Sequence, residues 1–414
     1  MAGAAAAVSP PVEKADATAW IAVAAGALGA MLATLDISIV NSALPTIQGE
    51  IGATGTEGTW IATAFLVAEI IIIPLSAWLE RLLGLRTLLI VAVSAFTAFS
   101  VLCGIATDLT TMIIGRTGQG FMGGALIPTA MTIVAKRLPP SQQPIGMALF
   151  GMTVVLGPVM GPLVGGWLTE NLSWHYAFFV NVPVCALLLA LLFIGLPHEK
   201  PDWVYLREAD WAGIAGMILG LGGLTIVLEE GHREEWFDST LIVQLTLMTV
   251  VGFALLTYGQ LYARKPVLKL RLMLSRQFAS VVVMALALGM VMYGSTYVIP
   301  QFLAIISDYN ALQTGLVIFW MGVPAFLLMP VLPFMIRRIH IRIAVGAGMF
   351  IMALSCFVSI NLTAESGGGV FTESQFLRGI GMILTMMFLN QATVASVAKE
   401  DAGDASGIFN AARN

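Results

Sequence analysis

Otherwise apolar stretches of the sequence contain four ionisable residues, Asp36, Glu69, Arg116 and Arg378. An ionisable group in apolar surroundings is costly, so such residues are candidates for function. A carboxylate there can take up and release a proton, and a guanidinium group can hold it in a charge-assisted hydrogen bond. These residue types therefore favour proton transfer. The sequence contains no Walker A motif that would indicate ATP as an energy source, and no nucleophile–base arrangement typical of an enzyme.

We expect Asp36 and Arg116 to lie at similar depths in the protein. Asp36 lies about 13 Å from one end of its apolar run and Arg116 about 10 Å from the end of another, counted by helical rise. An ion pair between them is geometrically allowed. The functional interpretation is a contact that opens when Asp36 takes up a proton. The alternative is a permanent salt bridge that joins two helices.

Glu69 lies near the middle of its apolar run. Burial disfavours its charged form, so we predict that it exchanges protons or contacts a cationic substrate. The alternative is a neutral carboxyl group hydrogen-bonded to a neighbouring helix. For Arg378 we expect a hydrogen-bonding role between helices. The segment IIGRTGQGF around Arg116 and the segment QFLRGIGMI around Arg378 form a weak internal repeat. Such a repeat is typical of transporters with duplicated halves.

The composition restricts the chain to membrane proteins. Hydrophobic residues make up 58% of it and charged residues only 11%, whereas soluble domains carry about 25% charged residues. The apolar residues must therefore face lipid, which predicts an all-α integral membrane protein with the bilayer as its first partner. No basic stretch is interleaved with aromatic residues, which excludes a nucleic-acid partner. The three cysteines lie in apolar runs and are expected to fill the core.

A helix needs roughly 20 apolar residues to cross a bilayer. On that rule we predict twelve transmembrane helices, at 20–44, 59–79, 87–107, 110–134, 145–168, 176–197, 211–229, 241–262, 278–303, 313–336, 343–362 and 372–397. A further helix begins near Ala405. We divide the chain into a tail (1–19), a six-helix bundle (20–197), a linker with two extra helices (198–270) and a second helical bundle (271–414).

Basic residues mark one side of the membrane. With the N-terminus inside, the loops assigned to the cytoplasm contain Arg81, Arg86, Lys136, Arg137, Lys200, Arg207, Arg264, Lys265, Lys269, Arg271, Arg276, Arg337, Arg338, Arg342 and Lys399. The opposite loops contain only Arg233, among several acidic residues. This asymmetry predicts a cytoplasmic N-terminus.

The predicted helix 145–168 is rich in glycine and proline. Its small and helix-bending residues are Gly157, Pro158, Gly161, Pro162, Gly165 and Gly166. Three of the glycines follow one another at intervals of four and share one face, which lets another helix approach closely. The prolines remove backbone donors and bend the helix. We interpret this segment as a hinge of a transporter, and plain helix packing is the alternative.

Several motifs together resemble those of the major facilitator superfamily, in particular its 14-helix drug:proton antiporters of the EmrB/QacA type. They are LDISIVNSALPTIQGEIGA at 35–53, GTWIATAFLVAEIIIIPLSAWL at 58–79, RTGQG at 116–120, GPVMGPLVGG at 157–166, SWHYAFFVNVP at 173–183 and IPQFLAIISDYNALQTGL at 299–316. The resemblance covers nearly the whole chain and is closest to the EmrB-like permeases.

The resemblance implies the export of amphipathic toxic compounds in exchange for protons, without a cofactor. It places Asp36 and Arg116 at the family's functional positions. Asn41 and Gln119, which lie in the same motifs, complete the predicted proton-coupling or substrate site with Glu69. It also implies an inner-membrane location, with a periplasmic adaptor (membrane fusion) protein and an outer-membrane channel as partners.

The sequence departs from the family in two places. The loop SAWLERLLGLR at 76–86 has Ala77 and Arg81 where the family's conformational motif has Gly and Asp, although Gly84 and Arg86 remain. In addition, twelve predicted helices are visible where the family has 14, which we interpret as a fragment lacking helices 13 and 14. A truncated non-transporting protein, a sensor and a proton-coupled importer are the alternative functions.

Overall fold

The computed structural model describes residues 14–328, 331–363 and 365–414. The predicted tail at 1–19 lies mostly outside these ranges, and the first helix begins at Ala17. The α-helices are α1 (Ala17–Glu50), α2 (Gly55–Gly58), α3 (Trp60–Leu83), α4 (Leu85–Gly104), α5 (Leu109–Gly123), α6 (Leu126–Arg137), α7 (Gln143–Asn171), α8 (Tyr176–Phe179), α9 (Asn181–Gly195), α10 (Val204–Arg207), α11 (Trp211–Glu230), α12 (Thr240–Tyr262), α13 (Arg276–Ile306), α14 (Ala311–Leu328), α15 (Leu332–Arg338), α16 (Ile341–Val358), α17 (Phe371–Ala395) and α18 (Ala402–Arg413). The 3-10 helices are η1 (Trp236–Asp238), η2 (Leu270–Leu274), η3 (Gly368–Val370) and η4 (Lys399–Asp401).

Each of the twelve predicted helices coincides with helical structure. Two of them consist of two segments, because α5 is followed by α6 and α8 by α9. The first of these breaks follows two glycines, Gly123 and Gly124. The predicted helix 313–336 corresponds to α14 and α15, between which residues 329 and 330 lie outside the described ranges. Nine of the described helices are long and apolar enough to cross a membrane. The helix predicted to begin near Ala405 is α18.

Polar side chains cap several helices at their first turn. Asp16, Asp108, Asp210 and Ser275 each accept a hydrogen bond from a backbone N–H group three residues further on, at the starts of α1, α5, α11 and α13. These bonds satisfy backbone donors that have no partner inside the helix. The apolar runs between the caps provide the length, and the caps set the starting points.

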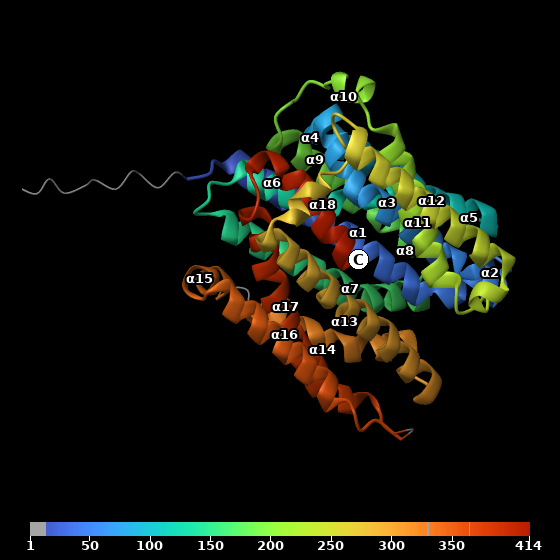
Figure 1. The fold of residues 1–414 in the computed structure, drawn as a ribbon. Coiled ribbons are helices and arrows are strands. Elements are labelled where there is room, and N and C mark those ends of the chain that lie inside the picture. The colour runs from blue at the N-terminus through green and yellow to red at the C-terminus, as the bar shows by residue number, and fades with distance from the viewer. Residues whose placement is uncertain (1–13, 329–330, 364) are drawn as a thin grey trace, which may run out of the picture.

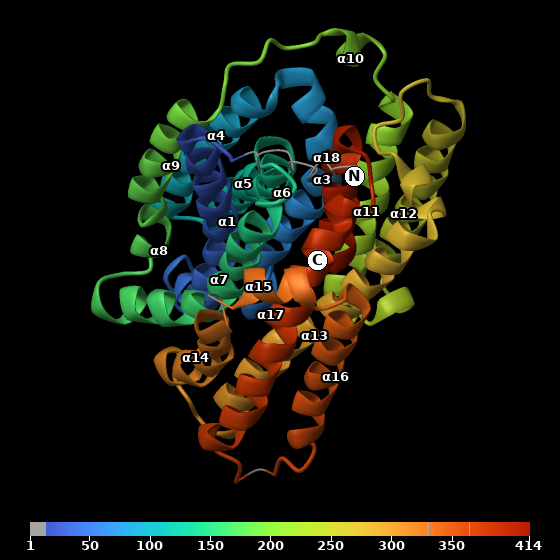
Figure 2. The same cartoon turned by 90° about the vertical axis from the view of Figure 1, so that its left-hand side faces the viewer.

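Two groups of helices pack against each other along α7. Helix α1 packs against α7, α6 and α9, while α5 packs between α3 and α4. In the second group, α17 packs against α14 and α16. Figure 1 and Figure 2 show α14, α16 and α17 extending away from the part formed by α1 and α3 to α9. Helix α18 leaves this second group and packs against α3 and α6 of the first.

Helices α11 and α12 form a closely packed pair on the flank of α3, as Figure 2 shows. A Cβ atom added at Gly252 of α12 would lie 2.2 Å from the backbone nitrogen of Gly220 on α11, so only glycine allows this approach. At one end of the pair, the Thr63 hydroxyl donates to Oε1 of Glu230 at 3.0 Å. The pair is therefore an addition fixed to α3 rather than part of either group.

The basic loops meet at one end of the molecule, which we call the basic end. Lys136 Nζ lies 2.5 Å from Oε1 of Glu80, and Arg81 Nη1 lies 2.6 Å from Oδ2 of Asp404. Lys269 also forms an ion pair with Asp401. These contacts connect loops that the sequence assigns to the same side of the membrane.

Candidate functional site

A buried ion pair lies at the centre of the first group of helices. Nη1 of Arg116, on α5, lies 2.6 Å from Oδ2 of Asp36, on α1. Gln119 Nε2 donates to Oδ1 of Asp36 at 3.2 Å, and Asn181 Nδ2 donates to the same oxygen at 2.6 Å. All four side chains are buried, and Asp36 and Arg116 are each 0% exposed. Donors from α5 and α9 thus converge on one carboxylate of α1.

Helix α3 fixes the position of the guanidinium group. Arg116 Nε donates to the backbone oxygen of Ile61 at 3.2 Å, and Cζ of Arg116 lies 4.2 Å from the ring centre of Phe65. A cation over an aromatic ring is stabilised by the charge distribution of the ring. Gly120 allows this approach, since a Cβ atom there would lie 2.2 Å from the backbone oxygen of Phe65.

Further hydrogen bonds orient the two amide side chains. Asn181 Nδ2 also donates to Ser100 Oγ at 2.9 Å, and Ser100 Oγ donates to the backbone oxygen of Phe178 at 2.9 Å. The Cys103 thiol donates to Oε1 of Gln119 at 3.4 Å. Cys103 therefore has a polar contact in addition to the packing role expected from the sequence.

The network can respond to protonation of Asp36. Loss of one partner from a buried ion pair typically costs about 3–5 kcal/mol, because the remaining charge stays buried without compensation. A proton on Asp36 would weaken its bonds to three donors at once, since each bond is strengthened by the negative charge. A change at this one carboxylate would thus affect the contacts of α1 with both α5 and α9.

The ion pair that the similar depths allow is present, and Gln119 lies in the network as expected. Asn41 lies apart from it, on an exposed part of α1. Five residues after Asp36, a helical position is rotated by about 140°, so the two side chains do not share a face. The sequence analysis missed Asn181. The available signal was that an amide stands at the start of the apolar run 181–195.

Glu69 lies outside this network, on α3, and is 4% exposed. Within the described part of the chain, its Oε1 atom has no hydrogen-bond partner. The charges that act on it belong to Arg413, Arg116 and Asp36. For the Oε1 atom, the alternative of a carboxyl group hydrogen-bonded to a neighbouring helix is therefore not realised. A buried oxygen without a partner is open to a proton or to a ligand.

The glycine face of α7 packs directly against α1. A Cβ atom added at Gly157 would lie 2.1 Å from Thr34 Oγ1, and one added at Gly161 would lie 2.1 Å from Ser38 Cβ. A Cβ atom added at Gly165 would lie 2.2 Å from Ser42 Oγ. The predicted close helix contact is thus present, and it lies on the helix that carries Asp36. Gly166 is buried next to it.

The second copy of the internal repeat occupies a corresponding place. Gly379 lies against the backbone oxygen of Met321 on α14, and Gly381 lies against that of Gly348 on α16. Helix α17 is thus wedged between α14 and α16, as α5 is between α3 and α4. Arg378 donates to Oε1 of Gln375 in its own helix at 2.7 Å, so this bond does not join two helices.

At the basic end, Arg81 stands where the family's motif has Asp, and its partner in the structure is an acid, Asp404. The ion pair with Asp404 joins α3 to α18, and Asp404 is 0% exposed. Gly84 has a φ of +78°, which favours glycine, and a Cβ atom there would lie 2.7 Å from Glu199 Cβ. Arg86 contacts α9 instead, where its Nη1 atom donates to the backbone oxygen of Leu196 at 3.0 Å.

In the described ranges, no three His, Cys, Asp or Glu side chains gather closely enough to hold a metal ion. The polar network and the glycine contact, both on α1, are the features to compare with known proteins.

Comparison with known families identifies the class of protein. The sequence profile of the Major Facilitator Superfamily matches residues 26–414. The chain belongs to this superfamily and is a multi-pass membrane protein. Solved structures agree in fold. The human organic anion transporter MFSD10 (TETRAN) has a TM-score of 0.65 at 16% identity, with 98% of this chain and 91% of that chain covered. The proton:xylose symporter XylE has a TM-score of 0.63 at 15% identity, with 95% and 86% covered.

Known proteins of similar sequence are bacterial resistance and multidrug export proteins. The chain is 32% identical to the Colistin resistance protein EmrB of Acinetobacter baumannii, over 96% of this chain and 78% of that protein. It is 31% identical to the Multidrug export protein EmrB of Escherichia coli K12, over 93% and 75%. The Fatty acid resistance protein FarB of Neisseria gonorrhoeae is also 31% identical, over 93% and 75%.

Proposed function

We propose that this chain is a multidrug efflux transporter that exchanges amphipathic toxic compounds for protons, with the proton gradient as its energy source. The observation that carries the proposal is the fully buried Asp36, held by Arg116, Gln119 and Asn181 from two other helices. The names of the EmrB proteins support the export of drugs.

In the proposed cycle, Asp36 takes up a proton from the side of high proton concentration. The neutral carboxyl group releases the donors of α5 and α9, and α1 is then able to move against them. The glycine face of α7 supports this step, because α7 contributes no side chains to the contact and so offers little resistance to sliding. Substrate binding in the opposite conformation favours loss of the proton. Only a ligand that distinguishes the two states can drive them in this way.

Glu69 is proposed to act in the same cycle as the second acid. Its Oε1 atom is buried and unpartnered among the described residues, so it can bind a proton or a cationic group of the substrate. A cation with its apolar part buried would gain most from such a group, because a buried carboxylate without a partner is costly. This role makes Glu69 a determinant of substrate charge.

The proposal includes a location and partners. We propose that the chain lies in the inner membrane with its N-terminus and basic end in the cytoplasm, because the loops there contain nearly all the lysines and arginines. The EmrB-like sequence supports pairing with a periplasmic adaptor protein and an outer-membrane channel. A transporter of this kind is not an enzyme.

Everted membrane vesicles with an imposed pH gradient and the dye ethidium test the proposed function. Asp36→Asn should abolish gradient-driven accumulation, whereas Asp36→Glu, which keeps an acid, should retain part of it. The matched control is Asp108→Asn, which alters an exposed acid that caps α5 and should accumulate dye like the wild type, since Asn also caps helices well. Full accumulation by Asp36→Asn would refute the assignment.

A further inference from the structure

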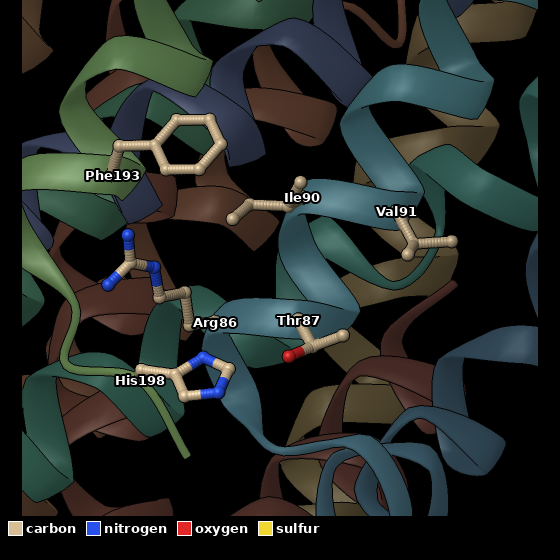
Figure 3. A pocket seen from close by; sticks show the side chains of 6 residues that line it. All are labelled: Arg86, Thr87, Ile90, Val91, Phe193 and His198. Atoms are coloured by element: carbon tan, nitrogen blue, oxygen red, sulfur yellow. The ribbon is translucent and has the colours of Figure 1, made fainter. Parts of the chain in front are cut away.

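A cavity unrelated to the Asp36 network opens at the basic end. It has a volume of about 280 Å³ and lies between the first turns of α4 and the end of α9. Six residues line it, and Figure 3 shows their side chains. They are Arg86, Thr87, Ile90, Val91, Phe193 and His198.

The lining separates into a polar and an apolar part. Figure 3 shows Arg86, Thr87 and His198 together at one end, with Ile90, Val91 and Phe193 at the other. Residue numbers increase along α4 from the basic end towards the interior of the membrane. The polar part therefore lies at the level of the membrane surface, and the apolar part lies at the level of the acyl chains. Val91 is 49% exposed and Phe193 54% exposed, so both face outward from the helices.

Existing contacts hold Arg86 in place for binding. Its Nη1 atom donates to the backbone oxygen of Leu196 at 3.0 Å, and its Cζ atom lies 5.3 Å from the ring centre of Phe193. These two contacts fix the planar guanidinium group while leaving further N–H donors for a ligand. A fixed guanidinium group matches the geometry of a phosphate group better than a mobile cation does.

The charges around the cavity favour an anion. The acid nearest in sequence is Glu199, and its Oε2 atom already accepts a hydrogen bond from the backbone N–H of Leu85 at 2.7 Å, at the start of α4. The positive end of the helix dipole offsets much of its charge there. Lys200 and Arg137 add positive charge at the same end, where Arg137 contacts the backbone oxygen of Gly195.

From this arrangement we propose that the cavity binds an anionic phospholipid of the adjacent leaflet. Its phosphate group lies between Arg86 and His198, with the Thr87 hydroxyl as a further donor, and its acyl chains run along Val91 and Phe193. Basic pockets between transmembrane helices are suited to such headgroups.

The size and shape of the cavity favour a lipid over free phosphate. Free phosphate would leave the apolar half of the cavity unfilled, whereas a lipid fills both halves. The exposed side chains of Val91 and Phe193 then contact the acyl chains of the lipid.

Native mass spectrometry of the delipidated full chain tests the proposal, with dioleoylphosphatidylglycerol and dioleoylphosphatidylcholine as probes. The wild type should bind the anionic lipid in preference to the neutral one. Arg86→Gln should weaken binding of the anionic lipid about fivefold, from the typical contribution of one basic residue near an anionic surface. His198→Gln should weaken it in the same direction without disturbing the bond between Arg86 and Leu196. Its effect therefore remains interpretable if the Arg86 variant folds poorly.

The matched control is Arg207→Gln, which removes one exposed positive charge from α10 and should bind both lipids like the wild type. Inorganic phosphate in millimolar excess should not displace the anionic lipid. Displacement by phosphate would show a site for free phosphate and overturn the proposal. Equal losses in the Arg86, His198 and Arg207 variants would also overturn it, because they would indicate attraction to the general charge of this end.

Discussion

Replacing Gly161 by alanine tests whether the close contact between α7 and α1 is required for transport. The added Cβ atom would lie 2.1 Å from Ser38 Cβ, whereas ordinary contacts begin at 3.4 Å. The two helices must therefore separate locally by about 1.3 Å, the difference between these distances. Neither the backbone nor the short serine side chain can move aside as the end of a long side chain would.

The expected cost follows from overpacking in helical cores, which typically destabilises by about 1–3 kcal/mol. If that cost falls on the conformation with α1 packed against α7, its population decreases about five- to 150-fold. Initial rates of dye accumulation in everted vesicles should decrease by a factor in this range. Thermal unfolding in detergent should occur at a lower temperature. Membrane insertion should be unchanged, because alanine is as apolar as glycine.

Two further variants make the result specific. Gly151→Ala lies on the same helix, but its Cβ atom would meet Nδ2 of Asn390 at 3.5 Å, which is ordinary contact. It should therefore transport like the wild type. Adding Ser38→Gly to Gly161→Ala removes the closest clash and should restore part of the rate. Wild-type transport by Gly161→Ala alone would show that the contact is not tight during the cycle.

Four other single variants and one double variant test the remaining residues. Arg81→Asp and Asp404→Arg should each lower transport and thermal stability, because each leaves a buried or half-buried charge unpaired, and combining them should restore both properties. Asn181→Ala should lower the free energy of unfolding by about 1.5–3 kcal/mol, which is typical of hydrogen bonds to charged groups. An unchanged unfolding temperature would contradict the geometry. Glu69→Gln should keep or raise the unfolding temperature, since it removes a buried charge, yet slow proton-driven efflux of a cationic dye. Equal efflux would exclude Glu69 from the cycle.

The helices could be predicted well from the sequence because the bilayer sets a minimum length for each apolar run. Depth along each run was also sufficient to predict the pairing of Asp36 with Arg116. The depth of a residue along a helix does not show which neighbouring helix its side chain faces, however. For this reason the prediction omitted Asn181 and included Asn41, which lies in the same motif as Asp36.

Contacts between distant segments could not be predicted from local patterns. Arg81 and Asp404 lie 323 residues apart, and each alone reads as an ordinary charge near a membrane surface. Arg81 in place of the motif's Asp put in doubt any conformational role that relies on that Asp, and the structure contains an ion pair between Arg81 and Asp404. Glycine spacing, by contrast, predicted the face of α7 correctly, since residues four apart share a side of a helix.

The most direct test of proton coupling is the release of protons when substrate binds. Ethidium is added to the purified chain in weakly buffered detergent solution containing a pH-indicator dye, and its binding is followed separately by fluorescence polarisation. The wild type should acidify the solution as ethidium binds, whereas Asp36→Asn should bind ethidium and release fewer protons, because only Glu69 then remains as an acid of the cycle. Equal acidification by both proteins would contradict the assignment of Asp36 as the proton-binding group.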